Sequence, residues 1–250
     1  MAQEQAAGRG ADEEAGAVPA RRAGDQGRYG RLSRERVLTS ALELVDREGL
    51  SALSMRRLGA ELGVEAMALY RYAASKDALL DGLVEALYLE LEERLAAGPG
   101  PTAEAPSWRT GLHRIARATY EVCLEHPQAV PLLTTRMLAV PLARRPLAVL
   151  KDHERVLALL GEAGLDDART VAAFQAFTAW LLGYASVELR PMVDNPEESD
   201  PAFRLGLHRM PPQELPGLRK AAPALTERGG PEGLAAGLDA LLDQFTGTGE

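Results

Sequence analysis

The stretch Ser54-Met-Arg-Arg-Leu-Gly-Ala-Glu-Leu-Gly63-Val-Glu-Ala-Met-Ala-Leu-Tyr70-Arg-Tyr-Ala-Ala-Ser-Lys76 decides the fold of this chain. Its pattern predicts two short helices joined by a tight turn at Gly63, where the backbone reverses. The second helix begins with small residues, which can lie against base edges in a DNA groove, and tyrosine and arginine at its far end can hold phosphates. The stretch therefore predicts a helix-turn-helix motif, although such turns and caps also occur in any three-helix globule.

Helix signals surround this motif on both sides. Ser33 is a suitable N-cap for a first helix with apolar residues at helical spacing, and Gly49 stands where that helix should end. Ser54 and Ser75 are expected to cap the next helix and a longer one further on. Between them we expect the second helix of the motif over residues 65–73.

The rest of the chain also predicts helices. Alanine and leucine are abundant and aromatic residues make up 5% of the chain, a composition that favours helices. We expect these helices over residues 108–126, 131–137, 146–163, 166–189 and 232–245. The prolines between residues 190 and 229 predict a long irregular connection, and the Pro/Gly stretch 98–106 predicts a loop.

The expected organisation is an all-α chain in three parts. Residues 1–27 carry almost no large apolar side chains and are expected to be disordered, because they cannot bury enough surface to offset their ordering entropy. Residues 28–77 are expected to form a helix-turn-helix DNA-binding domain with three helices. Residues 78–250 are expected to form a larger helical bundle.

Charge is distributed unevenly along the chain. The formal net charge is −8, which is unusual for a protein that binds nucleic acid over its whole surface. From Arg28 to Lys76, however, nine Lys and Arg accompany six Asp and Glu, which gives +3 and leaves −11 for the rest. We call residues 28–77 the head and residues 78–250 the body. A basic head on an acidic body suits a protein that touches DNA with one end only.

Several other classes of protein find no support in the sequence. The single cysteine, Cys123, permits no internal disulfide and is expected in the core. The start of the chain has no apolar signal core, and no stretch approaches the roughly 18 apolar residues that span a bilayer, so we expect a cytoplasmic protein without a membrane partner. His113, His126, His153 and His208 show no paired-ligand spacing. Since no nucleophile, phosphate-loop or paired-carboxylate motif is present either, we expect no metal, no cofactor and no enzymatic activity.

The motif resembles the DNA-binding segment of the tetracycline-repressor (TetR) family of bacterial transcription regulators. The similarity is carried by residues 34–50, 58–64, 69–72 and 75–80. The resemblance implies DNA contacts from Arg56, Glu65, Ala66, Met67, Ala68, Tyr70, Arg71, Tyr72 and Lys76.

These residues divide into two roles under the resemblance. The positions from Glu65 to Ala68 would face the bases, whereas Tyr70, Tyr72 and Lys76 would hold phosphates. The small side chains cannot form bidentate hydrogen bonds with bases, so sequence reading would depend on arginine, on methyl contacts and on DNA shape. Packing between helices is the alternative for both tyrosines. Arginines before the first helix, Arg28 and Arg31, could also reach the minor groove.

The same resemblance implies that residues 78–250 form a homodimer and hold a small-molecule effector. The helix at 166–189 is apolar on more than one face, which favours burial against a second copy; the alternative is a central core helix within one chain. The candidate pocket walls are aromatic residues and a methionine, each of which could equally be plain core: Trp108, Tyr120, Met137, Phe174 and Phe177.

The sequence therefore favours a ligand-responsive regulator of transcription that binds double-stranded DNA. Under this reading it is a repressor that releases a palindromic operator when a small molecule binds. Activation by a protein of the same fold stays open. A helical small-molecule-binding protein without a DNA function is the alternative from another class.

Overall fold

The computed structural model describes residues 32–97, 107–194 and 214–247 except 228, together with six single positions between 197 and 211. All regular elements in these residues are helices, which confirms the all-α fold class. The expected disordered tail 1–27 and the expected loop 98–106 lie outside the described residues, as do Arg28, Arg31 and His208.

The α-helices of the described residues are α1 Arg34–Glu48, α2 Met55–Leu62, α3 Ala66–Leu69, α4 Lys76–Ala97, α5 Trp108–Glu125, α6 Val130–Ala139, α7 Leu147–Glu162, α8 Asp167–Asp194, α10 Pro216–Thr226 and α11 Gly230–Thr246. Short 3₁₀ helices in the described residues include η1 Leu50–Ala52, η2 Pro127–Ala129 and η3 Leu142–Arg144.

Serine caps begin the helices of the head where the sequence predicts them. The Ser33 hydroxyl accepts a hydrogen bond from the backbone N–H of Arg36, at 3.1 Å. The Ser54 hydroxyl accepts one from the N–H of Arg57 at 3.1 Å, and α4 begins after Ser75 in the same way. Each cap satisfies one backbone donor that the first helical turn leaves unpaired.

Two glycines shape the turn between α2 and α3. Gly63 ends α2 in the left-handed conformation, with φ at 67°. The N–H of Val64 then donates to the carbonyl of Gly59 at 2.9 Å and closes the turn. A Cβ on Gly59 would lie 2.8 Å from the Val64 carbonyl oxygen, so this close approach of backbone to backbone requires glycine.

The second helix of the motif is shorter than predicted. We expected it over residues 65–73, but α3 ends at Leu69. The N–H groups of Tyr72 and Ala73 both donate to the Leu69 carbonyl, at 2.8 and 3.0 Å, and form a turn in place of further helix. Ala73 is buried at this turn, where a small side chain fits against the core.

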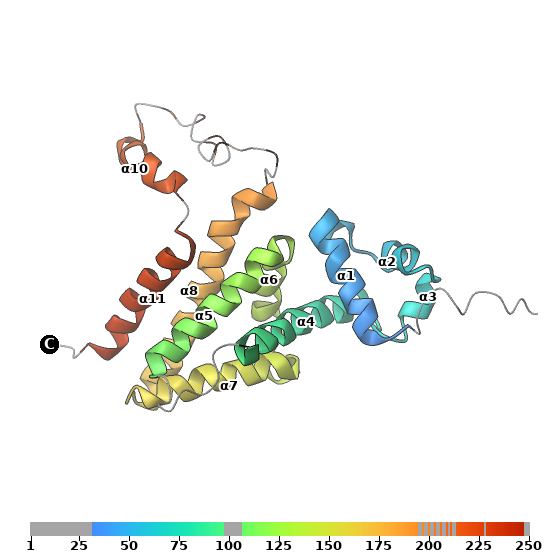
Figure 1. Cartoon of the computed structure of the whole chain (residues 1–250), viewed down its shortest axis with the longest axis horizontal. Coiled ribbons are helices and arrows are strands. Elements are labelled where there is room, and N and C mark those ends of the chain that lie inside the picture. Colours follow the sequence, from blue (N-terminus) through green and yellow to red (C-terminus); the bar gives the residue numbers. More distant parts are fainter. Residues whose placement is uncertain are drawn as a thin grey trace, which may run out of the picture. The chain divides into compact units, whose positions relative to one another are not determined.

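Helix α4 connects the head with the remaining helices. It packs against α1 on one side and against α5, α6 and α7 further along (Figure 1). Gly82 allows a close approach to α1, since a Cβ there would lie 2.6 Å from a methyl carbon of Leu38. An ion pair between Arg34 and Glu85, at 2.6 Å, joins the same two helices.

The irregular connection predicted for residues 190–229 is wrong in two places. Helix α8 continues to Asp194, and α10 occupies Pro216–Thr226. Pro216 fits the first turn of a helix, where its missing N–H has no intrahelical partner in any case. Pro223 lies inside α10 and removes one later bond, which the Ala- and Leu-rich residues around it tolerate.

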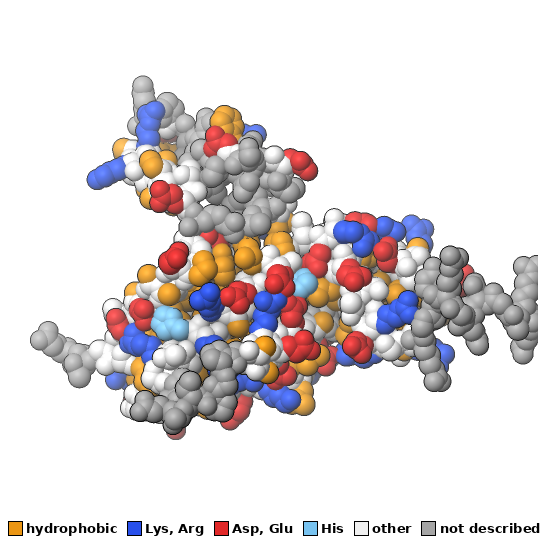
Figure 2. Space-filling view, in the orientation of Figure 1, with side chains coloured by type: hydrophobic (Ala, Val, Ile, Leu, Met, Phe, Trp, Pro, Cys, Tyr) orange, Lys and Arg blue, Asp and Glu red, His pale blue; other side chains and the backbone are white. Residues whose placement is uncertain are grey.

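Helix α8 has an open apolar face. Its segment Asp167–Arg190 is long and apolar enough to cross a membrane by length and composition, which corrects the expectation that no such stretch exists. A core helix of a soluble protein passes the same test, and α8 packs against α5, α6, α7 and α11. Only 28% of its most apolar window is buried, however, and Val187 is 77% exposed. Hydrophobic side chains gather over this helix in Figure 2.

Candidate DNA-binding surface

One buried leucine holds α3 in place while its other side faces outward. Leu69 is completely buried, whereas Met67 is 75% exposed. Tyr70 and Arg71 follow Met67 by three and four residues and are exposed as well. Met67 on α3 and Tyr70 and Arg71 in the turn after it are therefore exposed side chains of the motif, available for contacts with a partner.

The other positions of α3 are small or lie at its beginning. Glu65 is the exposed N-cap residue, and its side chain makes no capping hydrogen bond. Ala66 and Ala68 are half-buried. A helix with such short side chains can approach base edges closely, but its alanines can contact only methyl groups or backbone.

The neighbouring arginines of α2 have different environments. Arg57 bonds the Glu48 carboxylate at 2.5 and 3.2 Å, and this hydrogen bond lowers the pKa of Glu48. Arg47 joins the same cluster through Glu61, at 3.1 Å. Arg56 is exposed and has no hydrogen bond or ion pair within the described part of the chain. Local residue patterns do not tell these adjacent arginines apart, whereas the family resemblance selects Arg56. The structure leaves Arg56 available to an external anion.

Four further candidate residues lie near this arginine in the sequence of the motif. Arg71 and Lys76 are exposed, and neither is bonded to any residue that the structure describes. Tyr70 is 43% exposed, and its hydroxyl has no hydrogen bond among the described residues. Tyr72 is half-buried and has an interaction within the chain, so packing remains an alternative for it.

An arginine that the sequence did not single out neutralises the beginning of α4. Arg136, on α6, bonds Asp81 at 2.5 Å and Asp77 at 3.1 Å. Asp77 follows Lys76 directly, so its negative charge would otherwise oppose a phosphate bound there. The pairing connects the body of the protein to the beginning of α4.

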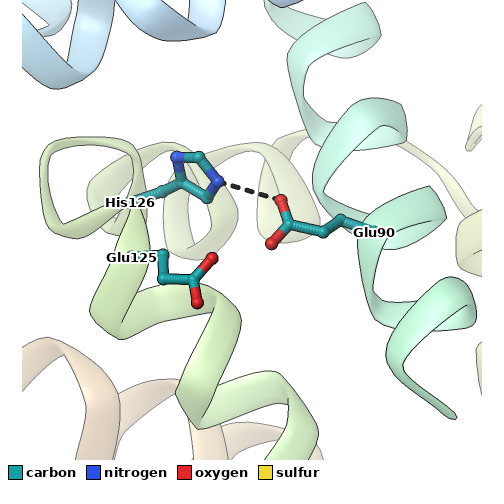
Figure 3. Close-up of side chains that lie close together, drawn as sticks. All are labelled: Glu90, Glu125 and His126. Atoms are coloured by element: carbon teal, nitrogen blue, oxygen red, sulfur yellow. Dashed lines mark hydrogen bonds and ion pairs between the residues drawn. The ribbon is translucent and has the colours of Figure 1, made fainter. Parts of the chain in front are cut away.

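A histidine at the end of α5 joins three helices. His126 Nδ1 lies 2.7 Å from Asp46 on α1, and its Nε2 lies 2.9 Å from Glu90 on α4 (Figure 3). The hydrogen bond with Asp46, followed by the bond with Glu90, raises the pKa of His126 although burial opposes this. Burial would raise the pKa of Glu90, but its bonds with Arg94 and His126 lower it overall.

Glu90, Glu125 and His126 also lie close enough together to be considered as a metal site. Their atoms already have partners within the chain. The guanidinium of Arg94 bonds both glutamates, and His126 uses both ring nitrogens for carboxylates, including that of Asp46. An ion-pair network therefore accounts for this cluster.

The five residues expected to line an effector pocket lie at different depths. Tyr120 and Phe177 are each 2% exposed, and the Tyr120 ring packs edge-on against Tyr184. Phe174 is half-buried beside His153. Trp108 is half-buried at the beginning of α5, and the side chain of Met137 lies outside the described residues.

A cavity of about 300 Å³ lies elsewhere, between α6 and the end of α8. Thr134 and Ser186 contribute polar atoms to it, and Val187 and Leu189 are among its apolar walls. Trp108, Tyr120, Phe174 and Phe177 are not among the described residues that line this cavity. Their assignment to an effector pocket stays a prediction.

Comparison with protein families agrees with a helix-turn-helix head joined to a helical body. Residues 37–83 match the model described as "Bacterial regulatory proteins, tetR family". Residues 100–244 match "Tetracyclin repressor-like, C-terminal domain", which extends over more than half of the chain. The chain belongs to the TetR family of bacterial regulatory proteins, and its body is of the tetracycline-repressor-like type.

Individual relatives are similar over part of the chain. An HTH-type transcriptional regulator of Saccharopolyspora erythraea is 35% identical over 63% of this chain and 61% of its own length. The HTH-type transcriptional repressor DrrR1 of Streptomyces coeruleorubidus is 34% identical over 63% of this chain and 54% of its own length. The chain thus spans little more than half the length of these relatives. A similar fold is seen in the crystal structure of the Streptomyces coelicolor TetR family protein ActR in complex with actinorhodin. The two sequences are 25% identical, the match covers 88% of this chain and 100% of the ActR chain, and the TM-score is 0.67.

Proposed function

We propose that the protein is a transcriptional repressor that binds a DNA operator through its head and releases it when a small molecule binds its body. The observation that carries the DNA-binding part is the set of exposed cations without internal partners: Arg56, Arg71 and Lys76. They belong to one helix-turn-helix and share it with the unbonded hydroxyl of Tyr70. Exposed cations and hydroxyls in this motif suit the sequence-independent contacts with phosphate that dominate DNA affinity.

We propose a homodimer as the binding form. A single α3 offers few side chains for sequence reading, and a dimer doubles them over two half-sites about one helical turn apart. The open apolar face of α8 supports this assembly, because a second copy would cover side chains such as Val187. The operator would then be palindromic, like the symmetric protein that binds it.

The relatives support the direction of the response. DrrR1 is named a repressor, and ActR is described in complex with the small molecule actinorhodin. Release would follow a shift in population: a bound molecule favours a dimer whose recognition helices no longer match successive major grooves.

A gel-shift series with the DNA upstream of the protein's own gene tests the proposal. We expect specific binding that weakens steeply with salt and is lost when Arg56 and Tyr70 are both changed to Ala. Absence of specific, salt-sensitive binding by the purified protein would overturn it. A reporter gene under the same DNA distinguishes repression from activation.

A further inference from the structure

Two neighbouring residues on α7 carry buried polar atoms without hydrogen bonds. Asp152 is 7% exposed and His153 is 5% exposed. Within the described part of the chain, neither ring nitrogen of His153 has a hydrogen-bond partner, and neither has Oδ1 of Asp152. Burying an unpaired polar group costs about 1–3 kcal/mol, and native proteins pair most of them. Three such atoms on adjacent residues therefore require an explanation.

The charged side chain of Arg155, on the same helix, lies too far from Oδ1 of Asp152 for a hydrogen bond. Arg155 Nη1 lies 3.6 Å from Oδ1 of Asp152, and its Nη2 lies 3.9 Å from Glu92 on α4. Both distances exceed a hydrogen bond, and Nη1 is itself buried and unbonded in the described residues. On the other side, the His153 ring packs edge-on against Phe174 of α8 with centroids 5.1 Å apart. The contacts described for Oδ1 of Asp152 and for the His153 ring are thus too long to be hydrogen bonds in the first case and aromatic in the second.

The ionisation of the two residues defines what they can bind. Burial, together with the charge of Arg145, lowers the pKa of His153 to about 4, so its ring is neutral at pH 7. A neutral imidazole offers one N–H donor and one nitrogen acceptor. Burial raises the pKa of Asp152 to about 6, although Arg155 opposes the shift. Apolar neighbours on the same helix, such as Val149 and Val156, penalise any further charge.

We infer that this layer of α7 is the effector site and that it takes an uncharged, mainly apolar molecule bearing hydroxyl or carbonyl groups. A hydroxyl would donate to the free nitrogen of His153, and a hydroxyl or carbonyl oxygen would accept its N–H. A further hydroxyl could donate to Asp152. The inference rests on the proposed function, in which the body binds a small molecule, and it names the chemical class.

Binding of such a molecule would affect the head through helix α4. Val149, one turn before His153 on α7, lines a crevice of about 10 Å³ that also touches Asp81 and Arg136. This crevice has room for about one water molecule, so a larger molecule must separate α7 from α4. Because α4 begins at Lys76 in the DNA-binding surface, its displacement would alter the head.

The experiment compares three pairs of probes with the full-length protein: phenol and benzene, 1-naphthol and naphthalene, 1-anthrol and anthracene. 1-Naphthoate serves as the charged probe for comparison with 1-naphthol. We expect equilibrium dialysis to give at least tenfold tighter binding of the hydroxylated member in one pair, and weaker binding of 1-naphthoate than of 1-naphthol. His153→Leu should reduce the preference for the hydroxyl below threefold. Without any probe, the same variant should raise the Tm, because it removes two unpaired nitrogens.

The matched control is His113→Leu on α5, whose ring nitrogen bonds Asp239 at 2.9 Å. This variant should lower the Tm and keep the hydroxyl preference. Equal binding within all three pairs, a preference that survives His153→Leu, or a lower Tm for that variant would overturn the inference. If His153→Leu does not fold, His153→Phe provides the same comparison with a ring that can pack against Phe174. Operator binding without probe is measured in parallel: its absence contradicts the proposed function, whereas intact operator binding without hydroxyl preference contradicts only the effector site.

Discussion

His126 Nδ1 lies 2.7 Å from Oδ2 of Asp46, so the end of α5 is bonded directly to the first helix of the head. The second ring nitrogen bonds Glu90 on α4, and Arg94 bridges Glu90 to Glu125. One imidazolium therefore joins helices from both parts of the described chain. These charges give the junction a dependence on pH.

We expect stability to fall as pH rises above 6.5. The hydrogen bond with Asp46 raises the pKa of His126 above its ordinary value of 6.5, so its contribution is complete below pH 6.5 and is lost as pH rises through the folded-state value. A hydrogen bond with a charged group is worth about 1.5–3 kcal/mol. Chemical denaturation between pH 6.5 and 8.5 measures the loss, and comparison with a His126 variant separates it from Asp152, whose pKa of about 6 lies at the lower end of this range. His126→Gln should flatten this profile; an unchanged slope would contradict the assignment.

Substitution of the two arginines of α2 should separate DNA binding from stability. Arg56→Ala removes an exposed cation, so operator affinity should decrease and the slope of log K against log salt should fall by about 1. Arg57→Ala breaks bonds with Glu48 and should lower the free energy of unfolding slightly, because the pair is solvent-exposed, while leaving operator affinity largely unchanged. Salt-dependent gel shifts and urea denaturation of both variants check this. Equal effects of the two variants on operator affinity would contradict the distinction.

The helix-turn-helix could be predicted from sequence because its signals are local. Ser33 and Ser54 as caps and Gly63 as a turn residue each act within a few positions, and the structure confirms all three. Two element boundaries could not be predicted in this way. Helix α3 ends at Leu69, where a turn replaces the expected further helix, and α10 forms although it contains Pro223.

The candidate site was less predictable, because availability depends on partners far along the chain. Nothing in the sequence shows that Arg57 is engaged by Glu48 whereas Arg56 is not. Arg136 and Asp77 are separated by 59 positions, and their pairing has no local pattern. The burial of the unpaired His153 nitrogens likewise depends on the packing of α7 against other helices, such as α8, and the spacing of His153 along the chain does not indicate it.

Gly59→Ala should destabilise the head. The added Cβ would lie 2.8 Å from the Val64 carbonyl oxygen, and backbone cannot move as a side chain can. We expect a loss of about 1–3 kcal/mol, typical of overpacking, together with weaker operator binding. Gly161→Ala on α7 is the matched control, since its Cβ meets no atom within 4 Å and helix propensity favours alanine. Thermal denaturation of both variants tests this, and a neutral Gly59→Ala would refute the close approach.

Arg136→Ala should weaken operator binding although Arg136 is not among the residues expected to contact DNA. The substitution releases Asp77, which Arg136 bonds at 3.1 Å, beside Lys76 in the candidate DNA-binding surface. An unneutralised carboxylate there repels phosphate, so we expect an affinity several-fold lower at low salt and a smaller difference at high salt. Adding Asp77→Asn to the variant should restore most of the affinity. Failure of this rescue would show that Arg136 acts through α6 packing instead.

Val187→Lys should convert the proposed dimer into a monomer. Val187 is 77% exposed on α8, whose most apolar window is only 28% buried, and a charge at the centre of an apolar interface is costly to desolvate. Leu142→Lys on η3 is the control, because Leu142 is also exposed, at 58%, but lies outside α8. Sedimentation equilibrium should show a monomer for the first variant and a dimer for the second, and operator affinity should follow the same division. A dimer that survives Val187→Lys would place the interface elsewhere, because a lysine ammonium could not remain buried there without a partner.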